Sequence, residues 1–248
     1  SMWSGTTFNL LDGDEGLIDA MQFDAAIRPH NIHHPRPRLL SLENTTMRGA
    51  GAAIHPDRMQ PVIDVARRHG LAVHLDGARL FNAAIALNVP VTDLTNPVDT
   101  VSICLSKGLG APIGSLLVGP RDFIERATTY RKWLGGGLRQ DGMLGAAGII
   151  ALTHHVDRLR EDHDRARQLA EDLRRIGYQI YQPAVPTNML MVDVPGSAEA
   201  FVEALAHEGV MTGALGPHRI RLVTHLDVND DHVAYALKVF DHLAEQYA

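Results

Sequence analysis

The sequence of 248 residues has little cysteine, few aromatic residues and no long hydrophobic run. Its single cysteine, Cys104, excludes an internal disulfide framework and suits a reducing compartment, so we expect a cytoplasmic protein or one of an organelle matrix. The apolar runs fall far short of the roughly 20 residues that a transmembrane helix needs. No signal-peptide pattern opens the chain. These absences predict a protein that does not enter the membrane.

Positive charge is also in short supply. The formal net charge is −6 and the pI is near 6.1, so the chain lacks the basic surface of a nucleic-acid-binding protein. The 14 histidines form neither a His-Glu-x-x-His motif nor a cluster with cysteine. We therefore expect solvated or capping histidines, no metal site and no nucleic-acid partner.

The first half of the chain alternates short apolar strands with amphipathic helices. Strands are predicted at 38–43, 71–76, 100–106 and 114–119. Helices are predicted from Pro56 to Gly70 and over 78–87. Strand–helix alternation with nearly continuous apolar strands indicates an α/β fold, with a mostly parallel sheet flanked by helices on both faces.

From about Gly142 the pattern becomes that of a smaller α+β unit. A long helix carries its apolar residues at helical spacing between Val156 and Ile176. Three short strands and two amphipathic helices follow, at 179–181, 189–194, 219–223, 198–207 and 230–247. We therefore divide the chain into a large domain over residues 1–155 and a small C-terminal domain over residues 156–248.

An acid and an arginine follow one of the predicted strands. Asp76 ends the strand and Arg79 comes three positions later, in the string His-Leu-Asp-Gly-Ala-Arg. Ligands of open parallel sheets bind beyond the carboxyl ends of the strands, so both side chains would face such a site. An ion pair that caps a helix start is an equally good interpretation of this segment alone.

A single lysine follows the next strand. Lys107 lies in Ser-Lys-Gly-Leu-Gly-Ala-Pro, where two glycines let other atoms approach the backbone closely. Burial at the end of an apolar strand would disfavour the charged ammonium, and an uncharged amine can form a Schiff base with an aldehyde. Taken alone, a surface lysine at a turn is the simpler interpretation. Cys104, inside that strand, is assigned to core packing.

A triple glycine precedes Arg139. The string Gly-Gly-Gly-Leu-Arg-Gln stands before a predicted helix and is rich in backbone N–H donors, which favours anion binding. A plain turn between two helices would have the same composition.

Together and in this order, these strings resemble the low-specificity L-threonine aldolases, which depend on pyridoxal 5'-phosphate (PLP) and share the fold type I of PLP-dependent transferases. Asp-Gly-Ala-Arg, Ser-Lys-Gly-Leu-Gly-Ala-Pro and Gly-Gly-Gly-x-Arg-Gln are highly specific in combination. Leu-Glu-Asn-Thr at 42–45 and Arg-Ile-Arg-Leu-Val-Thr-His at 219–225 extend the resemblance, which runs from about Gly16 to the end. It implies an aldehyde-lyase that cleaves L-threonine or L-allo-threonine to glycine and an aldehyde.

The resemblance also implies roles for individual residues. Lys107 would bind PLP covalently, and Asp76 would keep its pyridine nitrogen protonated. Arg79, beside the cofactor, and Arg221 would hold the substrate carboxylate, a task that suits planar bidentate donors. Arg139 would lie near the cofactor phosphate, across a subunit interface in a homodimer or homotetramer.

The start of the chain departs from the family pattern. Ser4, Gly5 and Thr6 resemble the family turn that grips the phosphate, and a helix would follow it. Asp12 already begins a loop that the family places far downstream, so the stretch with the histidine that stacks on the cofactor is missing. The large domain is therefore expected to be incomplete on its N-terminal side.

A second departure affects catalysis. Thr46 stands where the family has a histidine that handles the substrate hydroxyl, and a threonine is no base at neutral pH. Water or another residue would have to take that proton. The alternatives are a different PLP reaction, such as β-elimination or racemisation, and a catalytically inactive truncated or divergent relative without a complete cofactor site.

Overall fold

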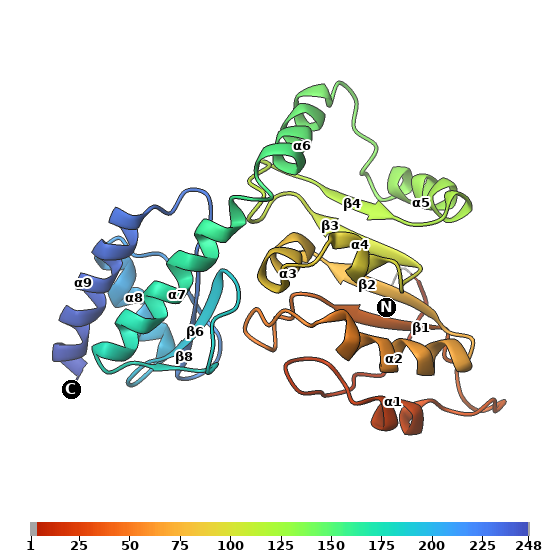
Figure 1. Cartoon of the computed structure of the whole chain (residues 1–248), viewed down its shortest axis with the longest axis horizontal. Helices are drawn as coiled ribbons and strands as arrows, with labels where there is room; N and C mark the ends of the chain where they lie inside the picture. The colour runs from red at the N-terminus through yellow and green to blue at the C-terminus, as the bar shows by residue number, and fades with distance from the viewer. Residues whose placement is uncertain (1–3, 248) are drawn as a thin grey trace.

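The computed structural model of the chain describes residues 4–247, with side chains up to residue 244. Two four-stranded sheets organise it, and the long helix α7 (Leu159–Arg175) leads from the first to the second (Figure 1). Between residues 4 and 247, no helix combines the length and the apolar character that crossing a membrane requires.

The first sheet has the order β1-β2-β3-β4. Strands β1 (Leu39–Glu43), β2 (Ala72–Gly77) and β3 (Thr100–Cys104) are parallel, and β4 (Ser115–Val118) runs antiparallel to β3. All four lie within two residues of the predicted strands, so the mostly parallel α/β fold is confirmed. The loop between β3 and β4 holds only residues 105–114, which is too short for the crossover that a parallel strand would need.

Helix α2 (Pro56–Arg68) has the ends that its sequence predicts. Pro56 occupies the first turn, where its missing N–H costs nothing, and the His55 side chain accepts the amide of Asp57 as a cap. Gly70 follows the helix with a φ of +65°, a conformation that favours glycine. The other predicted helix of this half is α3 (Leu80–Leu87), and it is also confirmed.

Three further helices were not predicted. Helices α1 (Ala20–Ala26) and α4 (Val91–Thr95) are too short for a periodic apolar signal, and each buries one apolar side chain, Phe23 or Leu94. Helix α5 (Arg121–Trp133) carries Phe123, Ala127 and Tyr130 at helical spacing, but in the structure it buries no residue.

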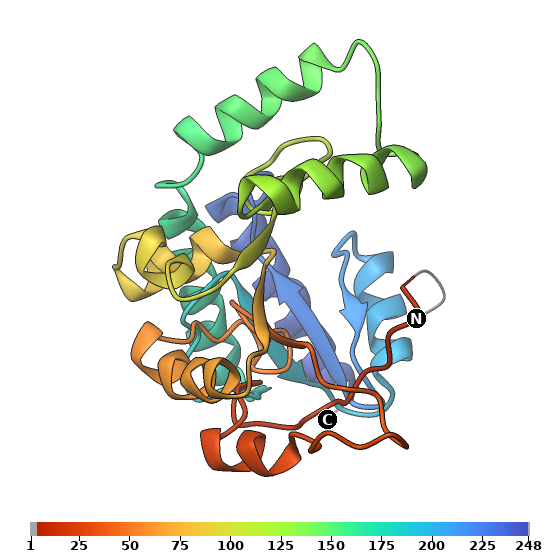
Figure 2. The ribbon, with the colours of Figure 1, turned by 90° about the vertical axis from the view of Figure 1, so that its right-hand side faces the viewer.

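The expectation of helices on both faces of the first sheet is wrong for the described residues. Side chains from α1 to α4 pack with one face, around Leu42, Leu75 and Val101. Along β1 and β2, buried residues alternate with more exposed ones. Because successive side chains of a strand point to opposite faces, the second face of the sheet is the more open one. Strand β4 is exposed at all four residues, and α5 and α6 (Gly142–His154) extend from it as an arm (Figures 1 and 2).

The second sheet is antiparallel, with the order β5-β6-β8-β7. Its core contains Tyr178, Phe201 and Phe240, whose ring centroids lie 5.3–6.0 Å apart. The predicted strands and helices are confirmed, and β7 is an additional short strand. The elements around α7 are β5 (Gln179–Ile180), β6 (Met189–Asp193), α8 (Ala198–His207), β7 (Gly213–Ala214), β8 (Arg219–Val223) and α9 (Asp230–Tyr247). Each sheet has its own hydrophobic core, and the division at residue 155 stays a prediction.

Candidate active site

The carboxyl ends of β1 and β2 place two acids next to each other. Glu43 ends β1, and Asp76 is its register partner in β2. Register partners of neighbouring strands point to the same face, which here is the open face of the sheet. The Asp76 carboxylate accepts the amide of Ala78 at 3.0 Å and stays exposed, whereas the half-buried Glu43 accepts the amide of Met47 at 3.1 Å.

Lys107 lies in the loop between β3 and β4. The loop turns at this residue, because the amide of Gly110 donates to the Lys107 carbonyl at 2.8 Å. The next residue, Gly108, lies so close to α3 and α7 that an added β-carbon would stand 2.8 Å from Leu159 Cδ2 and 3.7 Å from Asn82 Oδ1. The lysine is therefore followed by a backbone position at which a side chain would collide with α7.

The expected burial of Lys107 is wrong for the described residues, because the lysine is exposed. Strand β3 ends at Cys104, and Leu105 and Ser106 separate Lys107 from the end of the strand. The exposed side chain is accessible to a ligand or to a partner chain.

Charges of both signs converge on Glu43. Burial raises the pKa of this carboxyl, and the charge of Asp76 raises it further. The hydrogen bond from Met47 and the charges of Arg79 and Lys107 act in the opposite direction. Salt largely screens charges from one another beyond about 10 Å. Glu43, Asp76, Arg79 and Lys107 therefore lie near one another.

Arg79 links this site to the second sheet. Burial lowers the pKa of its guanidinium, the charge of Arg221 lowers it further, and Glu43, Cys104 and Asp76 oppose the shift. Arg221 belongs to β8, and its Nη1 lies 3.5 Å from the sulfur of Met47, just beyond the end of β1. The residues that influence one another in this way are here called the Lys107 cluster: Glu43, Asp76, Arg79, Cys104, Lys107 and Arg221.

The assignment of Cys104 to core packing is wrong. Its side chain is only partly buried, with Sγ 3.3 Å from the Ser106 hydroxyl. Burial raises the pKa of the thiol, but hydrogen bonds with Ser106 and the charge of Lys107 outweigh this effect and the pKa is lowered. The thiol is therefore part of the polar environment around the lysine.

The predicted residues divide into two groups. Asp76, Arg79, Lys107 and Arg221 lie in the Lys107 cluster. Arg139 is exposed in the loop between α5 and α6, and among the described residues no hydrogen bond or ion pair joins it to the cluster. Its role at a phosphate stays a prediction.

The turn at Ser4, Gly5 and Thr6 is exposed. The Ser4 and Thr6 hydroxyls lie 2.8 Å apart, and open space surrounds the position of a Gly5 side chain. The expected helix after this turn is wrong, because residues 5–13 contain no helix. The binding role of this turn stays a prediction.

Thr46 lies outside the open part of the site. It is 1% exposed, and its hydroxyl donates to the Glu15 carbonyl at 2.5 Å. This hydroxyl cannot turn toward a substrate without losing that bond. Sequence reasoning also missed Glu43, although the acid at the end of the string Leu-Leu-Ser-Leu-Glu, one strand away from Asp76, was a signal that could have identified it.

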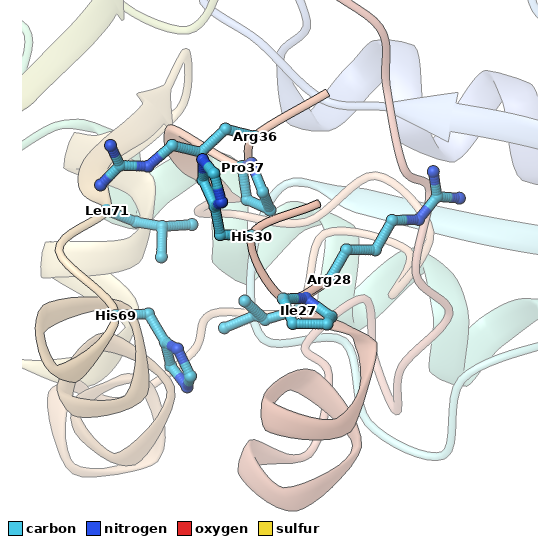
Figure 3. A pocket seen from close by; sticks show the side chains of 8 residues that line it. Ile27, Arg28, His30, Arg36, Pro37, His69 and Leu71 are labelled. Carbon is cyan, nitrogen blue, oxygen red and sulfur yellow. The ribbon is translucent and has the colours of Figure 1, made fainter. Parts of the chain in front are cut away.

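A cavity of about 350 Å³ lies elsewhere, between the segment after α1 and the end of α2. Its walls include Ile27, His30 and Leu71. Arg28 and Arg36 also line it, but their guanidinium groups extend in opposite directions (Figure 3). These charges do not converge on one ligand. Across the described part of the chain, no three His, Cys, Asp or Glu side chains are grouped as a metal site would require.

The chain is similar to known proteins in sequence and in fold. Residues 1–195 match the family described as beta-eliminating lyase. The chain is 46% identical to the low specificity L-threonine aldolase of Escherichia coli K12, over 89% of this chain and 64% of that protein. It spans between 64% and 66% of the length of the first three curated relatives that it matches.

Solved structures agree on the fold. A threonine aldolase from Leishmania major has a TM-score of 0.79 at 20% identity, over 93% of this chain and 68% of that one. A serine palmitoyltransferase from S. paucimobilis, holding PLP joined to myriocin, has a TM-score of 0.69 at 18% identity, over 92% and 60%. These likenesses confirm fold type I, and nothing in the comparisons supports an inactive relative. The resemblance to the low-specificity L-threonine aldolases is confirmed as well, and the chain belongs to the beta-eliminating lyase family.

Proposed function

We propose that the chain contains the catalytic residues of a PLP-dependent aldehyde-lyase that cleaves L-threonine or L-allo-threonine to glycine and an aldehyde. One observation carries this proposal. The exposed amine of Lys107, the acids Glu43 and Asp76, Arg79 at the start of α3 and Arg221 of β8 share one site at the carboxyl ends of β1 and β2.

The donor set of this site fits PLP at the aldehyde and ring end of the cofactor. The exposed Lys107 amine suits a bond to the aldehyde, and the exposed Asp76 carboxylate suits a protonated pyridine nitrogen. When bound, PLP withdraws electrons from the α-carbon of an amino acid. We further propose that Arg139 meets the phosphate from a second copy of the chain in a homodimer or homotetramer, because its own loop extends away on the arm.

The chain's own residues would bind the substrate and move its proton. Arg79, at the start of α3, and Arg221, in β8, can hold a carboxylate between planar donors. Glu43 is suited to take the β-hydroxyl proton, because it ends β1 beside Asp76 and burial raises the pKa of its carboxyl, which makes the carboxylate a stronger base. It would replace the missing histidine, since the hydroxyl of Thr46 is buried and donates to Glu15.

Substrate turnover tests this proposal. Purified protein with added PLP should release acetaldehyde from L-threonine or L-allo-threonine, which a coupled alcohol dehydrogenase assay measures. Glu43→Gln should slow release by about 100-fold or more, the range for loss of a general base. Asp76→Asn should keep the absorption band of the bound cofactor and lose most of its turnover. A protein that binds PLP and releases no aldehyde from either substrate would refute the lyase assignment.

A further inference from the structure

Buried polar side chains join the two sheets beneath the Lys107 loop. Asn82 of α3 places its Nδ2 at 3.0 Å from Nε2 of His163 on α7. The same Nδ2 lies 3.4 Å from Oδ1 of Asn188, the residue before β6. These three residues are 4%, 2% and 2% exposed, so water does not compete for their hydrogen bonds.

This network continues to the strand that carries Arg221. Asn188 donates through Nδ2 to the carbonyl of Thr224, the residue after β8, at 2.8 Å. The Thr224 hydroxyl donates back to the carbonyl of Asp162 on α7 at 2.6 Å. The end of β8 is thus tied to α7 on one side and to Asn188 on the other.

The other end of the network reaches the residue after Lys107. Asn82 Oδ1 and Leu159 Cδ2 lie 3.7 Å and 2.8 Å from the position of a β-carbon on Gly108, so the glycine packs directly against α3 and α7. Leu159 is fully buried, which leaves it little room to move. Asn82 therefore lies beside the position that a Gly108 side chain would occupy, next to Lys107, and through Asn188 it is joined to the end of the Arg221 strand.

Counting hydrogens defines the state of His163. The Asn82 Nδ2 carries two hydrogens and accepts none, so it satisfies two acceptors, His163 Nε2 and Asn188 Oδ1. In this pairing Nε2 of His163 accepts a hydrogen bond, as it does in a neutral ring with its proton on Nδ1. Burial, aided by Arg167 and Arg160 and opposed by Asp164, lowers its pKa to about 4, which keeps the ring neutral at pH 7.

We propose that His163 is a positioning residue that, through Asn82, holds Lys107 and Arg221 at the separation needed for cofactor and substrate binding. The inference rests on the proposed function, because it assigns a use to the separation of these two residues. His163 contacts neither of them directly, so its effect is transmitted by Asn82, Gly108 and the end of β8.

Two substitutions of His163 separate positioning from bulk packing. His163→Leu keeps much of the volume and removes the acceptor, whereas His163→Gln places an oxygen near the position of Nε2 and restores it. Phe201→Leu is the matched control, because Phe201 is fully buried in the C-terminal core and belongs neither to the network nor to the Lys107 cluster. The Phe201→Leu substitution should lower the stability of the protein while leaving the hydrogen bonds of the network in place.

The first measurement is amide hydrogen exchange of the protein without cofactor, followed in peptides that cover 105–111 and 222–225. In the wild type, the Gly110 and Ala111 amides are bonded to Lys107 and Leu105 within this loop, and the Thr224 amide to Asn188. His163→Leu should speed exchange in both segments by about tenfold, the equivalent of one hydrogen bond. His163→Gln should restore the wild-type rates, and Phe201→Leu should leave the two segments no faster than the rest of the chain.

The second measurement is the affinity for PLP, read from the visible absorption of the bound cofactor. His163→Leu should weaken binding by about tenfold, and His163→Gln should recover it. If the wild type binds no PLP, the proposed function fails, while the exchange experiment still decides whether the network holds the loop. If PLP binds normally to His163→Leu and exchange is unchanged, the proposed function stands and the positioning role is refuted.

If the His163→Leu variant does not fold, a second variant takes its place. Asn82→Ala removes the bond to His163 together with the bond to Asn188, and it carries the same two expectations. Equal effects of Phe201→Leu and His163→Leu on both segments and on affinity would overturn the proposal, because general loss of stability would then explain them.

Discussion

Strands β4 and β6 have similar apolar sequences and opposite surroundings. Strand β6 reads Met-Leu-Met-Val-Asp and is buried at its first four residues, whereas β4 reads Ser-Leu-Leu-Val and is exposed at all four. Helices α7 to α9 pack on one side of the C-terminal sheet, and Ala50 with Met47 packs against Met189 and Met191 on the other. Around β4, the helices α5 and α6 extend outward as an arm and cover little (Figure 2).

An apolar strand is buried only where another segment of the chain or a partner packs on it. The chain exposes 14783 Å². A compact protein of 27.1 kDa would expose about 10,800 Å² by the scaling of surface with mass. The arm carries much exposed apolar surface, including Trp133, Leu138 and Met143 at 73%, 57% and 84% exposed. The C-terminal part is closed on itself, and the β4 region is not.

The largest expected effect separates the two regions by mutation. Phe201→Ala should cost about 3–5 kcal/mol of unfolding free energy, because it empties a fully buried site beside Tyr178 and Phe240. Trp133→Ala, in the arm, should change it by less than about 0.5 kcal/mol, since that ring is 73% exposed. Urea unfolding measures both. Similar losses in the two variants would contradict the comparison.

A second prediction concerns pH and the closed region. The pKa of His163 is lowered from 6.5 to about 4, so between these values the unfolded chain binds a proton that the folded protein does not. Stability is therefore complete above pH 6.5 and falls as the pH drops toward 4, by up to about 3 kcal/mol. Because other groups also titrate there, the measurement is the difference in stability between the wild type and His163→Gln at several pH values. A difference that does not change with pH would refute a buried neutral His163.

The smallest effect on stability concerns the open region. Leu117 lines a groove of about 540 Å³ between β4 and α5 and is 42% exposed. Leu117→Ser should lower the fluorescence of a bound hydrophobic dye clearly, while the unfolding free energy changes by less than about 0.5 kcal/mol. The matched control is Leu190→Ser in β6, a fully buried position, where dye binding should rise as the protein loses stability. If Leu117→Ser leaves the dye fluorescence unchanged, the groove between β4 and α5 is not the apolar surface that binds the dye.

Sequence reasoning located most elements because their signals are local. Helices α8 and α9 were predicted with the bounds that the structure has, since an amphipathic stripe and a cap are visible within one segment. Helix α5 was missed although Phe123, Ala127 and Tyr130 recur along it at helical spacing. The open face of the first sheet was missed because the sequence of an apolar strand does not tell which chain covers it.

The candidate site could be predicted where one short string contains both a strand end and the residue beside it. Asp76 lies near the end of β2, Arg79 and Lys107 follow β2 and β3, and the strings around these residues made them candidates. Glu43 became a candidate only through its register with Asp76, which is a contact between segments distant in sequence. The network of Asn82, His163 and Asn188 joins residues up to 106 positions apart, and no local pattern reveals it.

The most direct test of the whole account is to find which amine binds PLP. The chain has only three lysines, Lys107, Lys132 and Lys238, so borohydride reduction followed by peptide mass spectrometry can distinguish them completely. The account predicts the mass of the reduced cofactor on Lys107 and no visible absorption band in Lys107→Ala. Labelling of Lys132 or Lys238 at the same level, or no labelling at saturating PLP, would contradict it.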